Sequence, residues 1–228
     1  DFCGCWRVKS LGGPESWVCA GRRVLRGESW LLQVLGRLGG GGVDPRIARC
    51  SNSHAMTITL RFAHPADAPL LPAVERAAAQ SFAAVPGLQH IASSPVLDAD
   101  RHLDFILRQH EWVAVDAQDR PLGFLCGQDC GEDWHIVELS VHQAAQGRGL
   151  GRRLIATAAD WARASGYAGL TLTTFARVPW NAPFYARLGF ECLTAEHCSD
   201  FLQRQLAAEH AHGLRDRCAM RLGLQGVS

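Results

Sequence analysis

From residue 57 onward, hydrophobic and polar positions repeat along the chain with periods that predict strands and helices in turn. Alternation with a period of two predicts strands over residues 57–62 and 217–222, and residues 111–115 and 122–126 are expected to form an antiparallel hairpin across a polar turn. Helical spacing or helix-forming composition predicts helices over residues 68–82, 98–109 and 201–210. Asp67 is the expected N-cap of the first helix, and residues 88–97 are expected to form a loop.

The segment 134–141 has an apolar majority, which predicts a central strand covered on both faces. A glycine-rich turn follows, and then an amphipathic helix on which Leu150, Leu154 and Ala158 share one face. Further on, the pattern predicts a strand over residues 170–175, a short helix over 181–188 and a short strand over 190–193. This alternation of strands and helices indicates an α/β fold.

Residues 1–55 differ from the rest of the chain and show no sustained period of 2 or 3.6. They hold eight basic and four acidic residues, whereas residues 56–228 hold fifteen basic and eighteen acidic ones. Met56 stands just before the first predicted strand, so we expect it to be the natural start. Residues 1–55 are then a non-native or disordered extension, and residues 56–228 form the functional domain.

Composition and charge exclude several classes of function. The 228 residues carry a formal net charge of +1, which gives no electrostatic basis for binding nucleic acid or an anionic membrane. No apolar run approaches the roughly 20 residues that span a bilayer. The nine cysteines have irregular spacing, which favours reduced thiols in a cytoplasmic protein. Cys126, Cys130 and His135 match no common zinc pattern, so no metal is expected.

The turn between the central strand and its helix is a candidate anion site. Glycine allows a ligand close to the backbone, and the first N–H groups of a helix point at such a ligand. Gly147, Gly149 and Gly151 do not make the dinucleotide fingerprint, because Arg152 stands where it needs glycine. The nucleoside-triphosphate loop needs a lysine, and residues 56–228 contain none. A glycine turn that serves only packing is the alternative.

The residues around this turn carry a family resemblance. The block from Glu138 to Ile155, with Gln146-x-x-Gly149-x-Gly151 after a central strand, resembles the pyrophosphate-binding motif of the GNAT N-acetyltransferase superfamily. Gln143 departs from it, because many members have proline there. This difference changes the stiffness of the loop and leaves the backbone donors in place.

A second segment strengthens the resemblance. Residues 179–190 contain Asn181, Tyr185 and a closing Gly-Phe pair, and this segment resembles the second signature of the family. The resemblance covers about 165 residues, from 57 to 222, and none of residues 1–55. It implies a GNAT-like mixed central sheet of about seven strands, flanked by helices and splayed at its two central parallel strands.

The resemblance also implies the ligand and its place. Acetyl-CoA would be the cosubstrate, between the strands that end at Val141 and Phe175. Its pantetheine arm would pair with the backbone of residues 139–141, and the side chain of Asn181 would touch the arm. The expected cofactor-binding residues are Leu139, Ser140, Val141, Gln146, Gly147, Arg148, Gly149, Leu150, Gly151 and Asn181.

Acetyl transfer to an amine requires a base, an oxyanion donor and an acid for the departing thiolate. Glu138 is the candidate base, directly or through a water, because partial burial on the central strand would raise its pKa. The backbone N–H near Val141 is the candidate oxyanion donor. Tyr185 is the candidate acid, since an unperturbed phenol has a pKa of about 10. The alternatives are a salt-bridge role for Glu138 and a packing role for Tyr185.

The acceptor is expected to be a primary amine of a small molecule, attacked directly in a ternary complex. Phe82, Pro86 and Trp180 are its candidate walls, and they favour an apolar or arylalkyl amine. A protein or peptide acceptor and a catalytically silent CoA-binding regulatory module are the alternatives. His142 is expected to be solvated, and His135 to face away from Glu138 because the two lie three positions apart on one strand. A homodimer is possible by resemblance.

Overall fold

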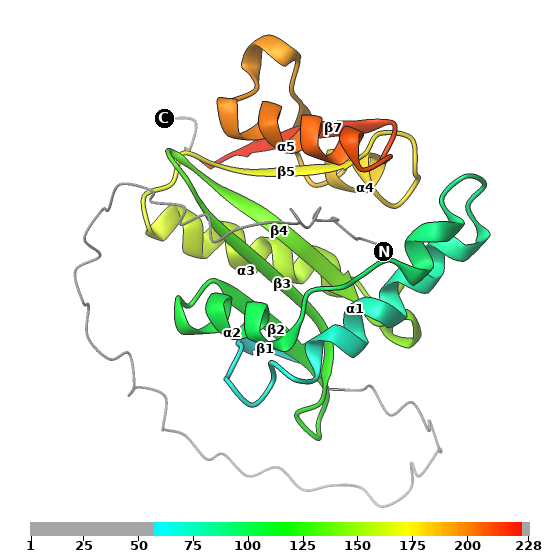
Figure 1. Cartoon of the computed structure of the whole chain (residues 1–228). Coiled ribbons are helices and arrows are strands. Elements are labelled where there is room, and N and C mark those ends of the chain that lie inside the picture. The colour runs from blue at the N-terminus through cyan, green and yellow to red at the C-terminus, as the bar shows by residue number, and fades with distance from the viewer. Residues whose placement is uncertain (1–56, 225–228) are drawn as a thin grey trace, which may run out of the picture.

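A seven-stranded mixed sheet forms the centre of the computed structural model, which describes residues 57–224 (Figure 1). The strand order is β1-β2-β3-β4-β5-β7-β6, and only β4 and β5 are parallel. The strands are β1 (Thr59–Phe62), β2 (Glu111–Val115), β3 (Pro121–Cys130), β4 (Asp133–Val141), β5 (Gly169–Phe175), β6 (Glu191–Cys192) and β7 (Arg217–Gly223). The predicted α/β fold is confirmed. The predicted division at residue 55 falls outside the described residues and stays a prediction.

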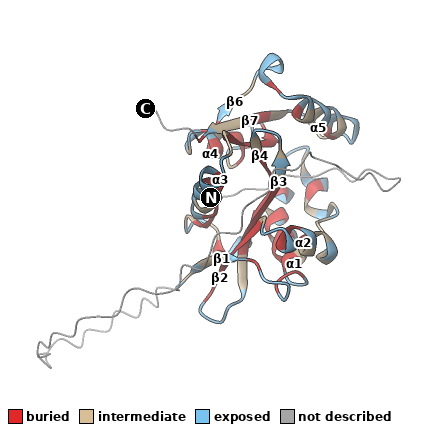
Figure 2. Cartoon of the chain, turned by 90° about the vertical axis from the view of Figure 1, so that its left-hand side faces the viewer, coloured by how far each residue is buried: buried red, intermediate tan, exposed pale blue. Residues whose placement is uncertain are grey.

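Helices cover both faces of this sheet, which explains why β2 and β4 are buried along most of their length (Figure 2). On one face lie α1 (Leu71–Ala79), α2 (Ala99–Leu107) and α5 (Asp200–Ala211). On the other lie α3 (Leu150–Ala164) and α4 (Ala182–Ala186). Short 3-10 helices complete the chain: η1 (Gln80–Ala84), η2 (Gln89–Ser93), η3 (Gln143–Ala145) and η4 (Ala195–His197).

The start of α1 differs from the prediction. Leu70 is the N-cap, and no side chain caps the helix. Asp67 instead accepts hydrogen bonds from the Arg61 guanidinium at 2.7 Å and from the His64 backbone N–H at 2.7 Å. A charged partner on β1 thus holds the carboxylate away from the helix. The helix is also shorter than predicted, because it tightens into η1, and the expected loop over residues 88–97 contains η2.

The parallel strands β4 and β5 stay paired for only a short distance. Asp133, Trp134 and His135 pair with Gly169, Leu170 and Thr171, and no pair follows. Beyond this point β4 keeps its partner β3 up to Val141, and β5 keeps β7 up to Phe175. The two strands diverge in the middle of the sheet (Figure 1). The predicted splay is therefore confirmed. We use this word for the region beyond His135 and Thr171, where β4 and β5 diverge, and one edge of β4 faces it.

A β-bulge reorients the second half of β4. Cys126 pairs with Glu138 while the next residue of β3, Gly127, pairs with Ile136, so Val137 is the extra residue. Ile136 and Leu139 both pack in the cluster under α3, whereas Val137 packs under α1 and α2. Glu138 consequently lies on the α1 face.

His135 lies on this same face, because its Nδ1 is 3.1 Å from Thr171 Oγ1 and its ring packs on Phe201 of α5. The prediction that His135 faces away from Glu138 is wrong, because the bulge breaks the simple alternation on which it relied. Burial lowers the pKa of His135 to about 3, which keeps the ring neutral.

A row of buried polar groups crosses three strands under α1 and α2. Glu111 of β2 lies opposite Cys126 of β3, which lies opposite Glu138 of β4. His102 of α2 places its Nδ1 2.7 Å from Glu111 Oε1, and Glu75 of α1 accepts a hydrogen bond from the Leu97 N–H at 3.0 Å.

Burial dominates the protonation of this row. It raises the pKa of Glu75 to about 8, and it raises the pKa of Glu111 against the opposing hydrogen bond from His102. The pKa of the Cys126 thiol is raised by burial and then by the charges of Glu111, Glu138 and Glu75. The Cys126 thiol is therefore protonated, and all three carboxyl groups influence the pKa of this one thiol.

We predict that Gly127→Ala destabilises the protein by about 1–3 kcal/mol or more, as overpacking does. A Cβ at this position would overlap the Trp134 ring and lie 2.5 Å from the His135 carbonyl oxygen. Chemical denaturation measures the effect. Gly223→Ala is the matched control, because its Cβ would lie 3.8 Å from the nearest atom. Equal stabilities of the two variants would show that the bulge does not need glycine.

We predict that Glu75→Gln changes how stability depends on pH. The folded pKa of Glu75 is raised from 4.5 to about 8, so the folded state holds the proton that the unfolded state releases. The wild type should therefore lose free energy of unfolding as pH rises through this window, by at most about 1.4 kcal/mol per pH unit. The substituted amide keeps an acceptor for the Leu97 N–H and cannot ionise.

The difference between the two unfolding curves should be smallest near pH 4.5 and should grow toward pH 8. Glu191→Gln, at an exposed strand position, serves as the control for removing a carboxylate. Curves for Glu75→Gln and wild type that stay parallel would contradict the prediction.

Candidate active site

The glycine turn leads directly from the end of β4 into α3. Gly147 and Gly149 have φ angles of +75° and +73°, a region that favours glycine, and Gly149 is the N-cap of α3. A Cβ built on Gly147 meets nothing within 4 Å, so there is space beside this backbone. The first N–H groups of α3 have no acceptor within the helix. A diphosphate fits this arrangement because these N–H groups and the helix dipole both favour an anion.

Side chains fix the turn from both ends. The Gln146 amide donates to the Val141 carbonyl oxygen at 3.0 Å and lies 3.5 Å from Ser81 Oγ of η1. The Arg148 guanidinium donates to the Ala144 carbonyl oxygen at 3.2 Å. Leu150 is buried in the core, so it offers only its backbone to a ligand.

Gly151 lies inside α3, beside α4. A Cβ at Gly151 would lie 3.5 Å from the Phe184 ring and 3.9 Å from Leu139 Cδ2, which are ordinary van der Waals distances. The packing around Gly151 therefore leaves room for a Cβ, and the expected contribution of its backbone to ligand binding stays a prediction.

The edge of β4 that faces the splay continues for six residues past His135, to Val141. Leu139 and Val141 point their side chains into the α3 cluster and are buried. Only backbone groups of residues 139–141 are thus available along this edge. An unpaired strand edge is a template for another extended chain with amide groups.

Glu138 lies beside this edge on the α1 face and is 3% exposed. The Ser140 hydroxyl donates a hydrogen bond to Glu138 Oε1 at 2.8 Å. Ser140 is predicted to bind through its backbone, and the structure adds this contact of its side chain. Its signal in the sequence was the spacing of two on one strand, which places both side chains on one face.

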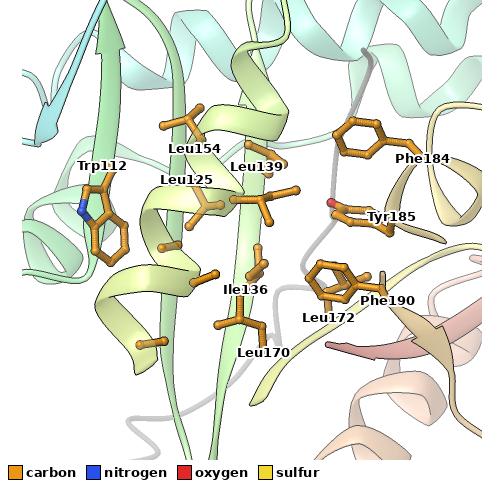
Figure 3. Packing of buried hydrophobic residues seen from close by; sticks show 14 of the residues in the cluster. Trp112, Leu125, Ile136, Leu139, Leu154, Leu170, Leu172, Phe184, Tyr185 and Phe190 are labelled. Carbon is orange, nitrogen blue, oxygen red and sulfur yellow. The ribbon is translucent and has the colours of Figure 1, made fainter. Parts of the chain in front are cut away.

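Tyr185 reaches the splay from the opposite face. Its ring packs between Phe184 and Phe190, with centroid distances of 5.3 and 5.4 Å, and its hydroxyl points from α4 toward β4 (Figure 3). Asn181 holds this helix: its carbonyl oxygen accepts from the N–H groups of Phe184 and Tyr185. Its side-chain amide donates to Thr174 Oγ1 of β5 at 2.8 Å. Asn181 therefore anchors α4 to β5, and its contact with a ligand stays a prediction.

Glu138 and Tyr185 consequently meet the splay from the two faces of the sheet, separated by the backbone edge of β4. A carboxyl group on one side and a phenol on the other suit a reaction in which one molecule approaches from each face. This juxtaposition depends on the bulge, because in a regular strand Glu138 would share the face of Ile136, which packs in the α3 cluster.

Aromatic side chains gather at the far end of the splay on the α1 face. The Phe82 ring lies 5.8 Å from that of Phe175 and 6.1 Å from that of Trp180. Phe82 and Trp180, two of the predicted acceptor walls, are thus brought together, whereas Pro86 lies exposed after η1. Phe175, at the end of β5, is a third aromatic that the sequence did not single out for this role.

The remaining candidates lie outside this arrangement. His142 Nδ1 accepts a hydrogen bond from the Ala144 N–H at 3.2 Å and so caps η3. Within residues 57–224, no group of three or more His, Cys, Asp or Glu side chains could hold a metal ion. Over the same residues, no helix combines the length and the apolar character that crossing a membrane requires.

Comparisons with known structures place the fold. The chain resembles the PaiA N-acetyltransferase of Thermoplasma acidophilum in complex with coenzyme A, with 17% identity, a TM-score of 0.55, and coverage of 74% of this chain and 99% of that one. It also resembles the yncA protein of Salmonella typhimurium with acetyl-CoA, with 20% identity, a TM-score of 0.54, and coverage of 75% and 96%.

A third similar structure belongs to a longer protein. The N-acetylglutamate synthase of Neisseria gonorrhoeae, complexed with coenzyme A and N-acetyl-glutamate, has 17% identity and a TM-score of 0.56. The match covers 75% of this chain but 36% of that synthase. All three likenesses concern the fold.

The family comparison covers the residues of the candidate site. Residues 80–190 match the model described as the acetyltransferase (GNAT) family, and this range contains the glycine turn, Glu138 and Tyr185. Residues 80–190 therefore form a GNAT acetyltransferase domain, and enzymes of this family draw their acetyl group from acetyl-CoA.

Proposed function

We propose that this protein transfers the acetyl group of acetyl-CoA to the primary amine of a small molecule, by direct attack in a ternary complex. The observation that carries the proposal is the early end of the β4–β5 pairing at His135 and Thr171. It leaves a strand edge that runs straight into the glycine turn. Glu138 and Tyr185 stand on the two sides of that edge.

The cosubstrate is held by backbone groups. The N–H groups from Gly147 to Gly151 bind the diphosphate, with the positive end of α3 behind them. The edge of β4 at residues 139–141 pairs with the amides of the pantetheine arm. Arg148 and Arg152 are exposed beside the turn and add positive charge near the phosphates.

Glu138 takes a proton from the attacking amine, directly or through a water. As the N–C bond forms, the acyl oxygen gains charge, and the backbone N–H near Val141 stabilises it. The C–S bond then breaks, and Tyr185 gives its proton to the departing thiolate. No covalent enzyme intermediate is needed. Glu138 then releases its extra proton to solvent, and Tyr185 takes one up from solvent.

The α1 face is the side from which the amine approaches, because Glu138 lies there. Phe82 and Trp180 touch across the end of the splay, which supports a small acceptor with an apolar portion over an extended peptide. A panel of amines and a panel of peptides, each with acetyl-CoA and detection of free thiol, tests this choice. Turnover only with peptides would reassign the acceptor, and no turnover with bound CoA would favour a regulatory module.

We predict that Gly149→Asp abolishes CoA binding, as measured by calorimetry. The substitution places a side chain and a negative charge in a left-handed position where the diphosphate is held. Gly131→Asp is the matched control, because Gly131 has a φ of +74° and lies in the turn between β3 and β4. Normal binding by Gly149→Asp would refute the assignment of the turn.

We predict that Tyr185→Phe lowers kcat about 10-fold or more and leaves the KM for acetyl-CoA nearly unchanged, since only a proton donor is lost. The other tyrosine of the chain provides the control. Tyr167 precedes β5, and its hydroxyl bonds to Asp129, so Tyr167→Phe should keep wild-type turnover. Equal kcat values for both variants would remove Tyr185 from the chemistry.

A further inference from the structure

We propose that the Ser140 hydroxyl is a positioning group for Glu138: it keeps the carboxylate ionised and oriented within surroundings that favour its protonation. This inference rests on the proposed function for its catalytic meaning, because Glu138 is the base there. The effect of the Ser140 hydroxyl on the protonation of Glu138 can be tested separately from catalysis.

The contact itself is short and shielded from water. Ser140 Oγ donates to Glu138 Oε1 at 2.8 Å, and the two residues are 2% and 3% exposed. A hydrogen bond donated to a carboxylate stabilises its charged form and lowers its pKa. It also fixes the carboxyl group in one rotamer, because Ser140 lies two residues further along the same strand. The hydrogen bond thereby fixes the position of Oε1.

The groups around Glu138 act in the opposite direction. Cys126 of β3 lies directly opposite, Glu111 of β2 lies beyond it, and Glu75 of α1 covers this part of the sheet. A second carboxylate nearby and the removal of water both favour the protonated form of a carboxyl group.

The other titratable groups of this region are paired elsewhere, neutral or exposed. His102 of α2 is already paired with Glu111. On β4, His135 is buried and held neutral, and on the next turn His142 accepts a hydrogen bond from a backbone N–H. Arg76 of α1 is exposed. The Ser140 hydroxyl therefore opposes the effect of burial and of the neighbouring carboxyl groups at the point where the base must be ionised.

The test uses the full chain labelled with 13C at the glutamate side-chain carboxyl carbon, titrated by NMR with CoA bound. Loss of one resonance in Glu138→Gln identifies the signal of Glu138. Ser140→Ala should raise the pKa of that signal by about one unit, because the donor to the charged form is lost. Ser140→Cys, nearly equal in size with a weaker donor, should raise it by less.

Thr173→Val is the matched control, because Thr173 Oγ1 donates to another buried carboxylate, Glu209, at 2.6 Å. It should leave the Glu138 signal unchanged. If neither Ser140 variant moves the pKa of Glu138, or if Thr173→Val moves it as much, the inference is overturned. Ser140→Cys keeps the test decisive if Ser140→Ala does not fold.

A second readout separates this inference from the proposed function. With the first amine that turns over, the acidic limb of the pH profile of kcat/KM should move upward in Ser140→Ala by the same amount as the NMR pKa. If the NMR pKa moves and the kinetic limb does not, Ser140 does control Glu138, and Glu138 is not the base. If only the kinetic limb moves, the hydroxyl acts elsewhere and the inference fails.

Discussion

The early end of the pairing between β4 and β5 is the constraint on which the site depends. Backbone amides inside a protein need hydrogen-bond partners, and a strand is ordered only when at least one neighbour supplies them. Here β4 is held by β3 and β5 is held by β7 along their whole lengths, so each remains ordered after the two separate. The facing edge of β4 is thus preformed, and a ligand with its own amides can complete the sheet.

The bulge at Val137 is the second constraint, and it bears on which side of the sheet holds Glu138. Counted on from Ile136, which packs in the α3 cluster, a regular strand would place Glu138 in that cluster, where a carboxylate has no polar surroundings (Figure 3). The extra residue places Glu138 on the α1 face instead, together with Ser140. The bulge in turn requires Gly127, because the Trp134 ring occupies the space that a side chain would need.

This placement has an electrostatic cost. Glu75, Glu111 and Glu138 all lie in the protein interior, and burial raises the pKa of Glu75 and of Glu111. Such groups contribute less to stability than apolar residues of the same shape would. Buried carboxyl groups under α1 therefore fit a role in function better than a role in stability.

The order of strands and helices, the glycine turn and the two family motifs can be read from the sequence. Those signals are local: residues 57–62 and 217–222 alternate, residues 134–141 are mostly apolar, and Gly147 and Gly149 have the conformations that their positions imply. Asp67 shows the limit of helix-capping rules, because Arg61, six residues earlier on β1, binds the carboxylate that would have capped α1.

The bulge at Val137 and the meeting of Phe82 with Trp180 came only with the tertiary structure. The bulge depends on the register between β3 and β4, in which Cys126 pairs with Glu138 and Gly127 with Ile136. The aromatic contact joins segments almost 100 residues apart. Interactions of this range leave no period in the sequence, because each partner is chosen by the fold that brings them together.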